Sequence, residues 1–163
     1  MRPATESEQK YLDKAAYYFE RARLCYVCEL WPESLNNHGS TLESLLRIRF
    51  ESGGTLFELV NKFDSDTFFN SVILHDGASR KCATCYADRI RIFRNSVHPD
   101  CWKVATQKDV DDSLLLILLV YHALVQCESQ RIADFQEPQG STLKTLMELC
   151  MTPSDTEATE GAS

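Results

Sequence analysis

The sequence contains little glycine and proline, and it has no long apolar segment. Six glycines and five prolines among 163 residues disfavour a fold made of short strands and many tight turns. The longest apolar run, residues 114–125, contains twelve residues, whereas a membrane-spanning helix needs about 20. The N-terminal residues are charged and lack the apolar stretch of a secretory signal. We therefore expect a cytoplasmic protein with no membrane partner.

Familiar catalytic signatures are also missing from the sequence. The chain has no glycine-rich phosphate loop, no HExxH metalloprotease motif and no Ser/His/Asp order of a serine hydrolase. Asp109, Asp111 and Asp112 stand at the start of an expected helix, where acids complement the helix dipole, so we assign them no metal. Three histidines are expected to be hydrogen-bonded core or boundary residues, namely His38, His75 and His122.

Apolar residues recur at intervals of three and four, which predicts an all-α helical bundle with four or five main helices. The expected helices span about residues 7–30, 32–53, 56–63, 84–97 and 109–132, with a weaker helical segment between 64 and 79 and a short amphipathic turn at 143–150. Thr5 and Glu8 have the spacing of a capping box, and Pro32 suits the first turn of the second helix. We expect a single domain over residues 1–151 and a disordered acidic tail over residues 152–163.

Charge is unevenly distributed along the chain. The protein has a formal net charge of −7, which disfavours a nucleic-acid partner for the chain as a whole. Residues 80–94, however, carry five basic side chains and one acid, a local net charge of +4. Arg80, Lys81 and Arg89 of this segment are candidate RNA-binding residues, since phosphate binding depends on clustered cations.

The expected helix over residues 84–97 carries two stripes of side chains. An apolar stripe suited to the core consists of Tyr86, Ile90, Phe93 and Val97. A polar stripe at i, i+3, i+4 and i+7 consists of Arg91, Arg94, Asn95 and His98. An imidazole can transfer a proton near neutral pH, and guanidinium groups bind and neutralise phosphate oxygens. Together they suit metal-independent RNA cleavage by attack of the ribose 2′-hydroxyl on the adjacent phosphate.

The stretch RIFRNSVHP, residues 91–99, resembles the marker motif of the HEPN superfamily of small all-α domains, an arginine followed a few residues later by a histidine. Similar segments flank it in the expected order, TLESLLR at 41–47, TLFELVNKF at 55–63 and KDVDDSLLLILLVYHAL at 108–124. The resemblance covers about residues 10–131 and implies a HEPN-like bundle.

This resemblance also implies a function, a metal-independent endoribonuclease of a toxin, defence or RNA-processing system that needs no cofactor. By position, His98 would transfer the proton, Arg91 or Arg94 would contact the scissile phosphate, and Asn95 would orient the site. Catalytic faces in the family are usually completed by a second protomer, so the resemblance implies a homodimer. An antitoxin or a nucleotidyltransferase is a further candidate partner.

The spacing between arginine and histidine leaves a non-catalytic alternative open. Six residues separate Arg91 from His98, but Arg91 is followed by apolar Ile92. Arg94 is followed by polar Asn95 and leaves only three residues before the histidine. Non-catalytic members of the superfamily keep parts of this pattern. The second hypothesis is therefore a regulatory module that binds a nucleotide, an RNA or a partner protein.

Seven cysteines, four of them in two CxxC pairs, provide a third hypothesis, a small zinc-stabilised interaction domain. One set of four thiolate ligands consists of Cys25, Cys28, Cys82 and Cys85. A competing set with zinc-finger-like spacing consists of Cys82, Cys85, His98 and Cys101. The second set competes directly with the proposed catalysis because it uses the same histidine.

Overall fold

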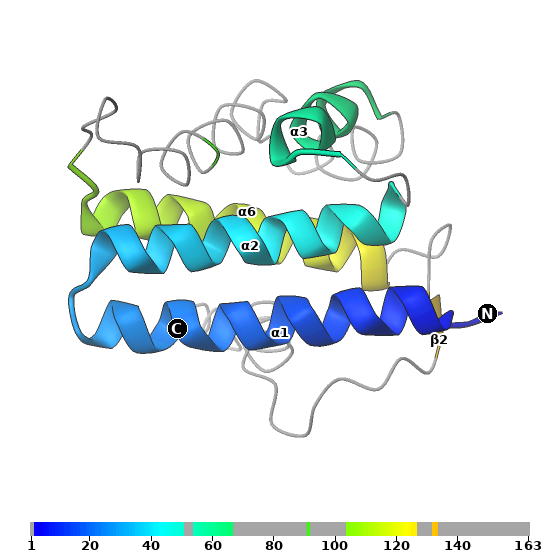
Figure 1. Ribbon diagram of the computed structural model, residues 1–163, viewed down its shortest axis with the longest axis horizontal. Helices are drawn as coiled ribbons and strands as arrows, with labels where there is room; N and C mark the ends of the chain where they lie inside the picture. The colour runs from blue at the N-terminus through cyan, green and yellow to red at the C-terminus, as the bar shows by residue number, and fades with distance from the viewer. Residues whose placement is uncertain (1, 51–53, 67–90, 92–103, 127–131, 134–163) are drawn as a thin grey trace, which may run out of the picture.

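The computed structural model describes residues 2–50, 54–66, 91, 104–126 and 132–133 of the chain. Four helices form this part of the protein (Figure 1). They are α1 (Glu6–Val27), α2 (Trp31–Arg49), α3 (Leu56–Ser65) and α6 (Gln107–Gln126). The only other regular structure in the described part is a parallel pair of two-residue strands, β1 (Arg2–Pro3) and β2 (Ile132–Ala133). The predicted all-α class is confirmed for the described residues.

Helix α2 occupies the centre of the described bundle. It packs against α1 along its length and also contacts α6 and α3. In Figure 1, α1 and α3 lie on opposite sides of α2, with α6 alongside it. The apolar face that the sequence predicts for α2 is fully used, since Leu35, Leu42, Leu45, Leu46 and Ile48 are all buried. A helix with neighbours on several sides needs such a wide apolar face.

One main core joins all four helices. Its members include Leu12 and Phe19 of α1, Leu42, Leu45 and Leu46 of α2, Leu59 and Phe63 of α3, and Leu116, Ile117 and Tyr121 of α6. A smaller cluster of Leu35, Ala105 and Val110 packs with Tyr26 and Trp31. Ser34 also links two helices, because its buried hydroxyl donates a 2.9 Å hydrogen bond to the Ala22 carbonyl.

Three of the helices begin with a threonine followed three residues later by an acid. Thr5 and Glu8 form the predicted capping box at α1, and Thr55 and Glu58 form a second one at α3. At α6 the carboxylate of Asp109 accepts hydrogen bonds from the Thr106 backbone N–H at 3.0 Å and from its hydroxyl at 2.7 Å. These side chains satisfy backbone groups that a helix start leaves without partners. Asp109 is therefore a capping acid, as its first-turn position predicts.

Helix α1 ends at Val27, three residues before the predicted end, because the chain turns there in a Schellman motif. The Leu30 N–H donates to the Cys25 carbonyl at 2.9 Å, and the Glu29 N–H donates to the Tyr26 carbonyl at 3.0 Å. Glu29 carries the left-handed conformation of this motif, with φ 59°. Glycine is the usual residue at that position, and its absence explains why the sequence predicts an end just before Trp31 and Pro32 instead of at Val27.

Replacing Glu29 with glycine should stabilise the protein by about 1 kcal/mol, because glycine adopts positive φ without the steric cost of a side chain. Chemical denaturation of wild type and Glu29→Gly measures this difference. Glu20→Gly is the matched control, since the same substitution inside α1 should destabilise by about 1 kcal/mol. A Glu29→Gly variant that loses as much stability as the control would contradict the assignment.

Other boundaries also differ from the prediction. Helix α2 ends at Arg49 with Phe50 as its C-cap, earlier than the glycine pair at 53–54 predicts. The prediction that the last long helix reaches residue 132 is wrong, since Ile132–Ala133 forms β2 and pairs with β1 in the register Arg2 to Ile132 and Pro3 to Ala133. A two-residue strand is too short to produce alternating hydrophobicity, so the sequence carries no signal for it.

Several predicted segments lie outside the described residues: the weak helix at 64–79 beyond residue 66, the helix at 84–97 apart from Arg91, the turn at 143–150 and the tail at 152–163. Among the helices that the structure describes, none has both the length and the apolarity to cross a membrane.

Candidate functional site

Arg91 is the one member of the predicted polar stripe that the structure describes. Its backbone is helical and its side chain is partly exposed. The guanidinium carbon lies 5.0 Å from the ring centroid of Phe57, which stands in the first turn of α3. The remaining predicted catalytic and RNA-binding residues lie outside the described part: Arg94, Asn95, His98, Arg80, Lys81 and Arg89.

The contact between Arg91 and Phe57 is a cation–π interaction on the surface. Phe57 is 52% exposed, while its neighbours Leu56 and Leu59 are buried and fix α3 to the core. A guanidinium that stacks on an aromatic face is oriented by the ring, and its N–H donors lie in its own plane. This arrangement suits a nucleotide: its phosphate could accept hydrogen bonds from the edge of the guanidinium, and its base could pack on the exposed aromatic ring.

Two ion-paired arginines of α2 hold α3 beside it and so position Phe57. The Arg47 guanidinium donates to Glu43 and to the Gly54 carbonyl, each at 2.7 Å. Arg49 pairs with Asp66 at 3.2 Å. These contacts connect the end of α2 to both ends of α3, and all four charged side chains are at most 22% exposed. Phe57, the aromatic partner of Arg91, therefore belongs to a helix that is held firmly against α2.

The structure describes one of the two CxxC pairs. Cys25 and Cys28 are both free thiols, the first half-buried in the last turn of α1 and the second exposed at its C-cap. Burial raises the pKa of the Cys25 thiol, which disfavours the thiolate that a zinc site requires. Within the described ranges, no group of three His, Cys, Asp or Glu side chains could hold a metal. The other proposed zinc ligands, Cys82, Cys85, His98 and Cys101, lie outside those ranges.

His38 is the buried core histidine that the sequence predicts. Only 3% of it is exposed, its ring stacks near Phe19 with centroids 6.0 Å apart, and Nδ1 hydrogen-bonds to the Ser113 hydroxyl. Since that hydroxyl donates to the Val110 carbonyl at 2.8 Å, it accepts from the imidazole N–H, which places the proton on Nδ1. Burial lowers the pKa of His38 to about 4. With Ser113 only 2% exposed, this pair is structural and has no access for a substrate.

His122 differs from the expectation in one respect. It is a boundary residue, as predicted, but its buried Nδ1 has no hydrogen-bond partner in the described structure. The prediction of a hydrogen bond is therefore not met at that atom. His75 lies outside the described residues.

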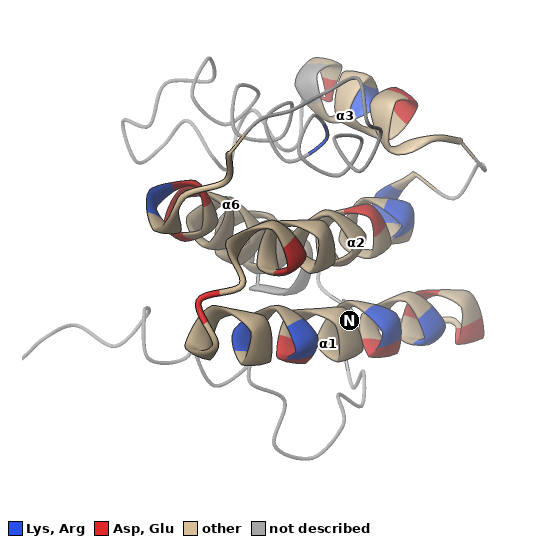
Figure 2. Cartoon of the chain, turned by 60° about the vertical axis from the view of Figure 1, so that its left-hand side comes forward, with Lys and Arg blue, Asp and Glu red and all other residues tan. Residues whose placement is uncertain are grey.

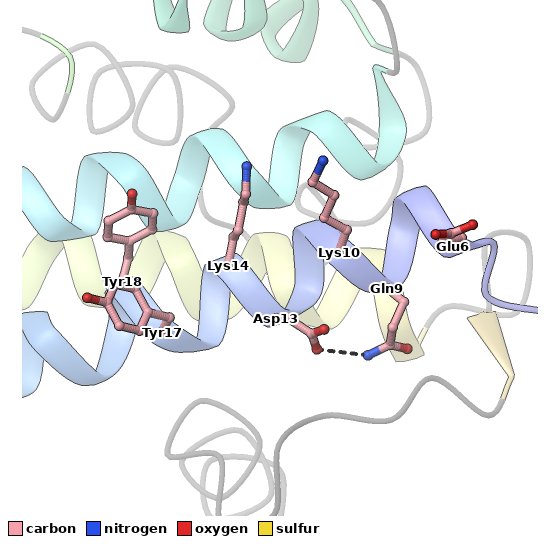
Figure 3. A pocket seen from close by; sticks show the side chains of 7 residues that line it. All are labelled: Glu6, Gln9, Lys10, Asp13, Lys14, Tyr17 and Tyr18. Atoms are coloured by element: carbon pink, nitrogen blue, oxygen red, sulfur yellow. Dashed lines mark hydrogen bonds between the residues drawn. The ribbon is translucent and has the colours of Figure 1, made fainter.

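A surface hollow that the sequence prediction did not include lies along α1 (Figure 3). It has a volume of about 620 Å³. The described residues that line it are Glu6, Gln9, Lys10, Asp13, Lys14, Tyr17 and Tyr18. Gln9 donates to Asp13 at 3.0 Å, and the Tyr17 and Tyr18 rings meet edge to face at 5.3 Å. These seven residues all belong to α1. The only sign of the hollow in the sequence is therefore the tyrosines and lysines on the outer side of this helix.

Comparison with known protein families, with curated protein sequences and with solved structures finds no match to this chain.

Proposed function

We propose that this protein is a HEPN-like, metal-independent endoribonuclease whose site is the polar stripe Arg91, Arg94, Asn95 and His98. The observation that supports this proposal is the helical Arg91 with its guanidinium held over the exposed ring of Phe57. A guanidinium beside an exposed aromatic ring is a suitable contact for one nucleotide of an RNA strand. The locally basic segment 80–94 supplies further cations, with Arg80, Lys81 and Arg89 as proposed RNA contacts.

In the proposed reaction, His98 accepts the proton of the ribose 2′-hydroxyl as the 2′-oxygen attacks the adjacent phosphorus. The bond from phosphorus to the 5′-oxygen breaks, and the protonated His98 returns the proton to that oxygen as it leaves. Arg91 and Arg94 meet the negative charge that develops on the phosphate oxygens, and Asn95 orients the site. The products are a 2′,3′-cyclic phosphate and a 5′-hydroxyl. As in related composite sites, a homodimer would bring two such stripes together.

The chemistry of this reaction can be tested with modified substrates. A chimeric oligonucleotide with 2′-deoxyribose at one position should not be cut after that position, because the attacking hydroxyl is missing there. The matching all-RNA oligonucleotide should be cut in excess chelator and should carry cyclic phosphate ends. Cleavage after the deoxy position would rule out the proposed mechanism.

A non-catalytic nucleotide- or RNA-binding module is the second candidate, and the same contact favours it. The Arg91 and Phe57 pair can bind a nucleotide by stacking and by charge without any proton transfer. The oligonucleotide experiment distinguishes the two candidate functions, because a binding module would bind the RNA and leave it uncut.

A further inference from the structure

The outer face of α1 carries large apolar side chains that no part of the described bundle covers. Tyr17 is 57% exposed, Leu24 is 54% exposed and Val27 is 69% exposed. They follow one another at i, i+7 and i+10, the spacing of a helix-packing seam. The buried residues of α1, including Leu12, Phe19 and Ala22, lie on the side of the helix opposite Tyr17 and Leu24. Exposed apolar residues in such a regular row indicate an interaction surface.

Charges of opposite sign border this seam. At about 100° per residue, Asp13 and Glu20 lie about 40 to 60° to one side of Tyr17, and Lys14 and Arg21 lie about 40 to 60° to the other side. The members of each pair are seven residues apart. Figure 3 shows the two sides directly, since Lys14 points away from the edge on which Asp13 lies. In Figure 2, ribbon segments coloured for acidic and for basic residues accordingly alternate along α1. We call Asp13 and Glu20 the acidic edge and Lys14 and Arg21 the basic edge.

The basic edge has no carboxylate partner within the described structure. Arg21 instead contacts Tyr17, with its guanidinium 5.6 Å from the ring centroid and a 3.1 Å hydrogen bond to the hydroxyl. Lys14 lies 5.9 Å from the ring of Tyr11. Elsewhere in the described bundle, Arg23, Arg47, Arg49 and Lys108 are all paired with carboxylates. The cations beside the seam are thus available to an external acid.

We propose that α1 is a self-association surface on which a second copy of this chain docks with its own α1 in parallel. A two-fold axis along the helices places the basic edge of each copy opposite the acidic edge of the other. Lys14 then faces the partner's Asp13, Arg21 faces the partner's Glu20, and Tyr17 and Leu24 pack against their symmetry equivalents. An antiparallel pairing places like charges together, which disfavours it.

This surface and the proposed RNA site belong to different parts of the fold. Figures 1 and 2 both show α1 and α3 on opposite sides of α2, and Arg91 contacts α3. Among the described residues, Glu20 is the one member of the two edges that forms an ion pair, with Arg23, and both side chains are more than 40% exposed. Exposed pairs of this kind are weak, so exchanging partners costs little. The α1 contact is separate from the stripe-to-stripe contact of the proposed ribonuclease, and a chain that makes both contacts assembles beyond the dimer. The inference therefore stands whether or not the protein cleaves RNA.

Charge-reversed variants test the proposal by sedimentation velocity of the full chain at low salt, over about 10 to 300 μM. Wild type should form dimers. Lys14→Glu/Arg21→Glu makes both edges acidic, and Asp13→Lys/Glu20→Lys makes both edges basic, so each variant alone should dimerise at least about tenfold more weakly. An equimolar mixture of the two variants should restore dimers that contain one copy of each. Circular dichroism confirms that each variant is folded.

The matched control is Lys62→Glu/Lys108→Glu, which makes the same change in net charge on exposed positions of α3 and α6. This variant should dimerise nearly as well as wild type. Any weakening that it shows measures the general repulsion caused by the added negative charge. The proposal is overturned if wild type stays monomeric over this range, if both reversals leave the dimer intact, or if the two variants fail to associate when mixed. If the dimer forms through residues 91–98 instead, both charge reversals should leave it intact.

Discussion

Lowering the pH from 7 to 4 should cost the protein about 3 kcal/mol of unfolding free energy through His38 alone. In the folded protein, burial lowers the pKa of this imidazole to about 4. Its ordinary value, near 6.5, applies in the unfolded chain. The neutral form is compatible with the bond from Nδ1 to Ser113 and with the apolar surroundings. A charged imidazole at 3% exposure would lose its hydration without gaining a carboxylate partner from the described residues.

The direction of the pH dependence follows from these two pKa values. Because the folded pKa lies below the unfolded pKa, the unfolded chain binds the extra proton between pH 6.5 and 4. The contribution of His38 is therefore complete above about pH 6.5, falls as the pH decreases, and is lost by about pH 4.

Urea denaturation of wild type and His38→Gln from pH 7.5 to 4 measures this effect. Glutamine does not titrate, so the difference in unfolding free energy between the two proteins should be constant above pH 7 and should shrink by about 3 kcal/mol toward pH 4. All other titrating groups are shared and cancel in the difference. Parallel pH profiles for the two proteins would show that His38 is not buried in its neutral form.

The local rules of helix formation account for most of what the sequence predicts correctly. The capping pair Thr5 and Glu8, the early Pro32 and the apolar spacing of α2 each depend on neighbouring residues, so they are visible in the sequence alone. The end of α1 is different, because Glu29 adopts a conformation that glycine usually adopts. There the tight turn between α1 and α2 overrides the local preference of the residue.

Long-range contacts could not be predicted from the sequence. The placement of Arg91 over Phe57 joins two segments that are far apart along the chain, and helical periodicity specifies only which residues share one helix. The same limit applies to the pairing of Arg2 with Ile132, where the decisive partner is backbone from the other end of the described chain. For the rest of the polar stripe, Arg94, Asn95 and His98, the catalytic assignment stays a prediction from the sequence.

The outer face of α1 could not be recognised from helical periodicity. A regular buried stripe indicates which side of α1 faces the core and does not indicate what covers the other side. The seven-residue repeats of Asp13 with Glu20 and of Lys14 with Arg21 are equally visible in the sequence. They gain meaning only with the exposure of Tyr17 between them.

Replacing His98 with alanine should reduce RNA cleavage by at least about 100-fold, because a positioned general acid or base contributes about 10²- to 10⁴-fold to such reactions. RNA binding should persist, since the cations of segment 80–94 and the Arg91 contact remain. His75→Ala is the matched control, the same substitution at a histidine to which no catalytic role is assigned, and it should cleave like wild type.

The most direct test of the proposed function is therefore a cleavage assay in excess chelator that compares wild type, His98→Ala and His75→Ala on single-stranded and structured RNA. Thermal unfolding of the same samples verifies that all three proteins are folded. We predict metal-independent cleavage by wild type and His75→Ala and its loss in His98→Ala. Intact RNA after incubation with folded, dimeric wild type, or undiminished cleavage by His98→Ala, would contradict the proposal.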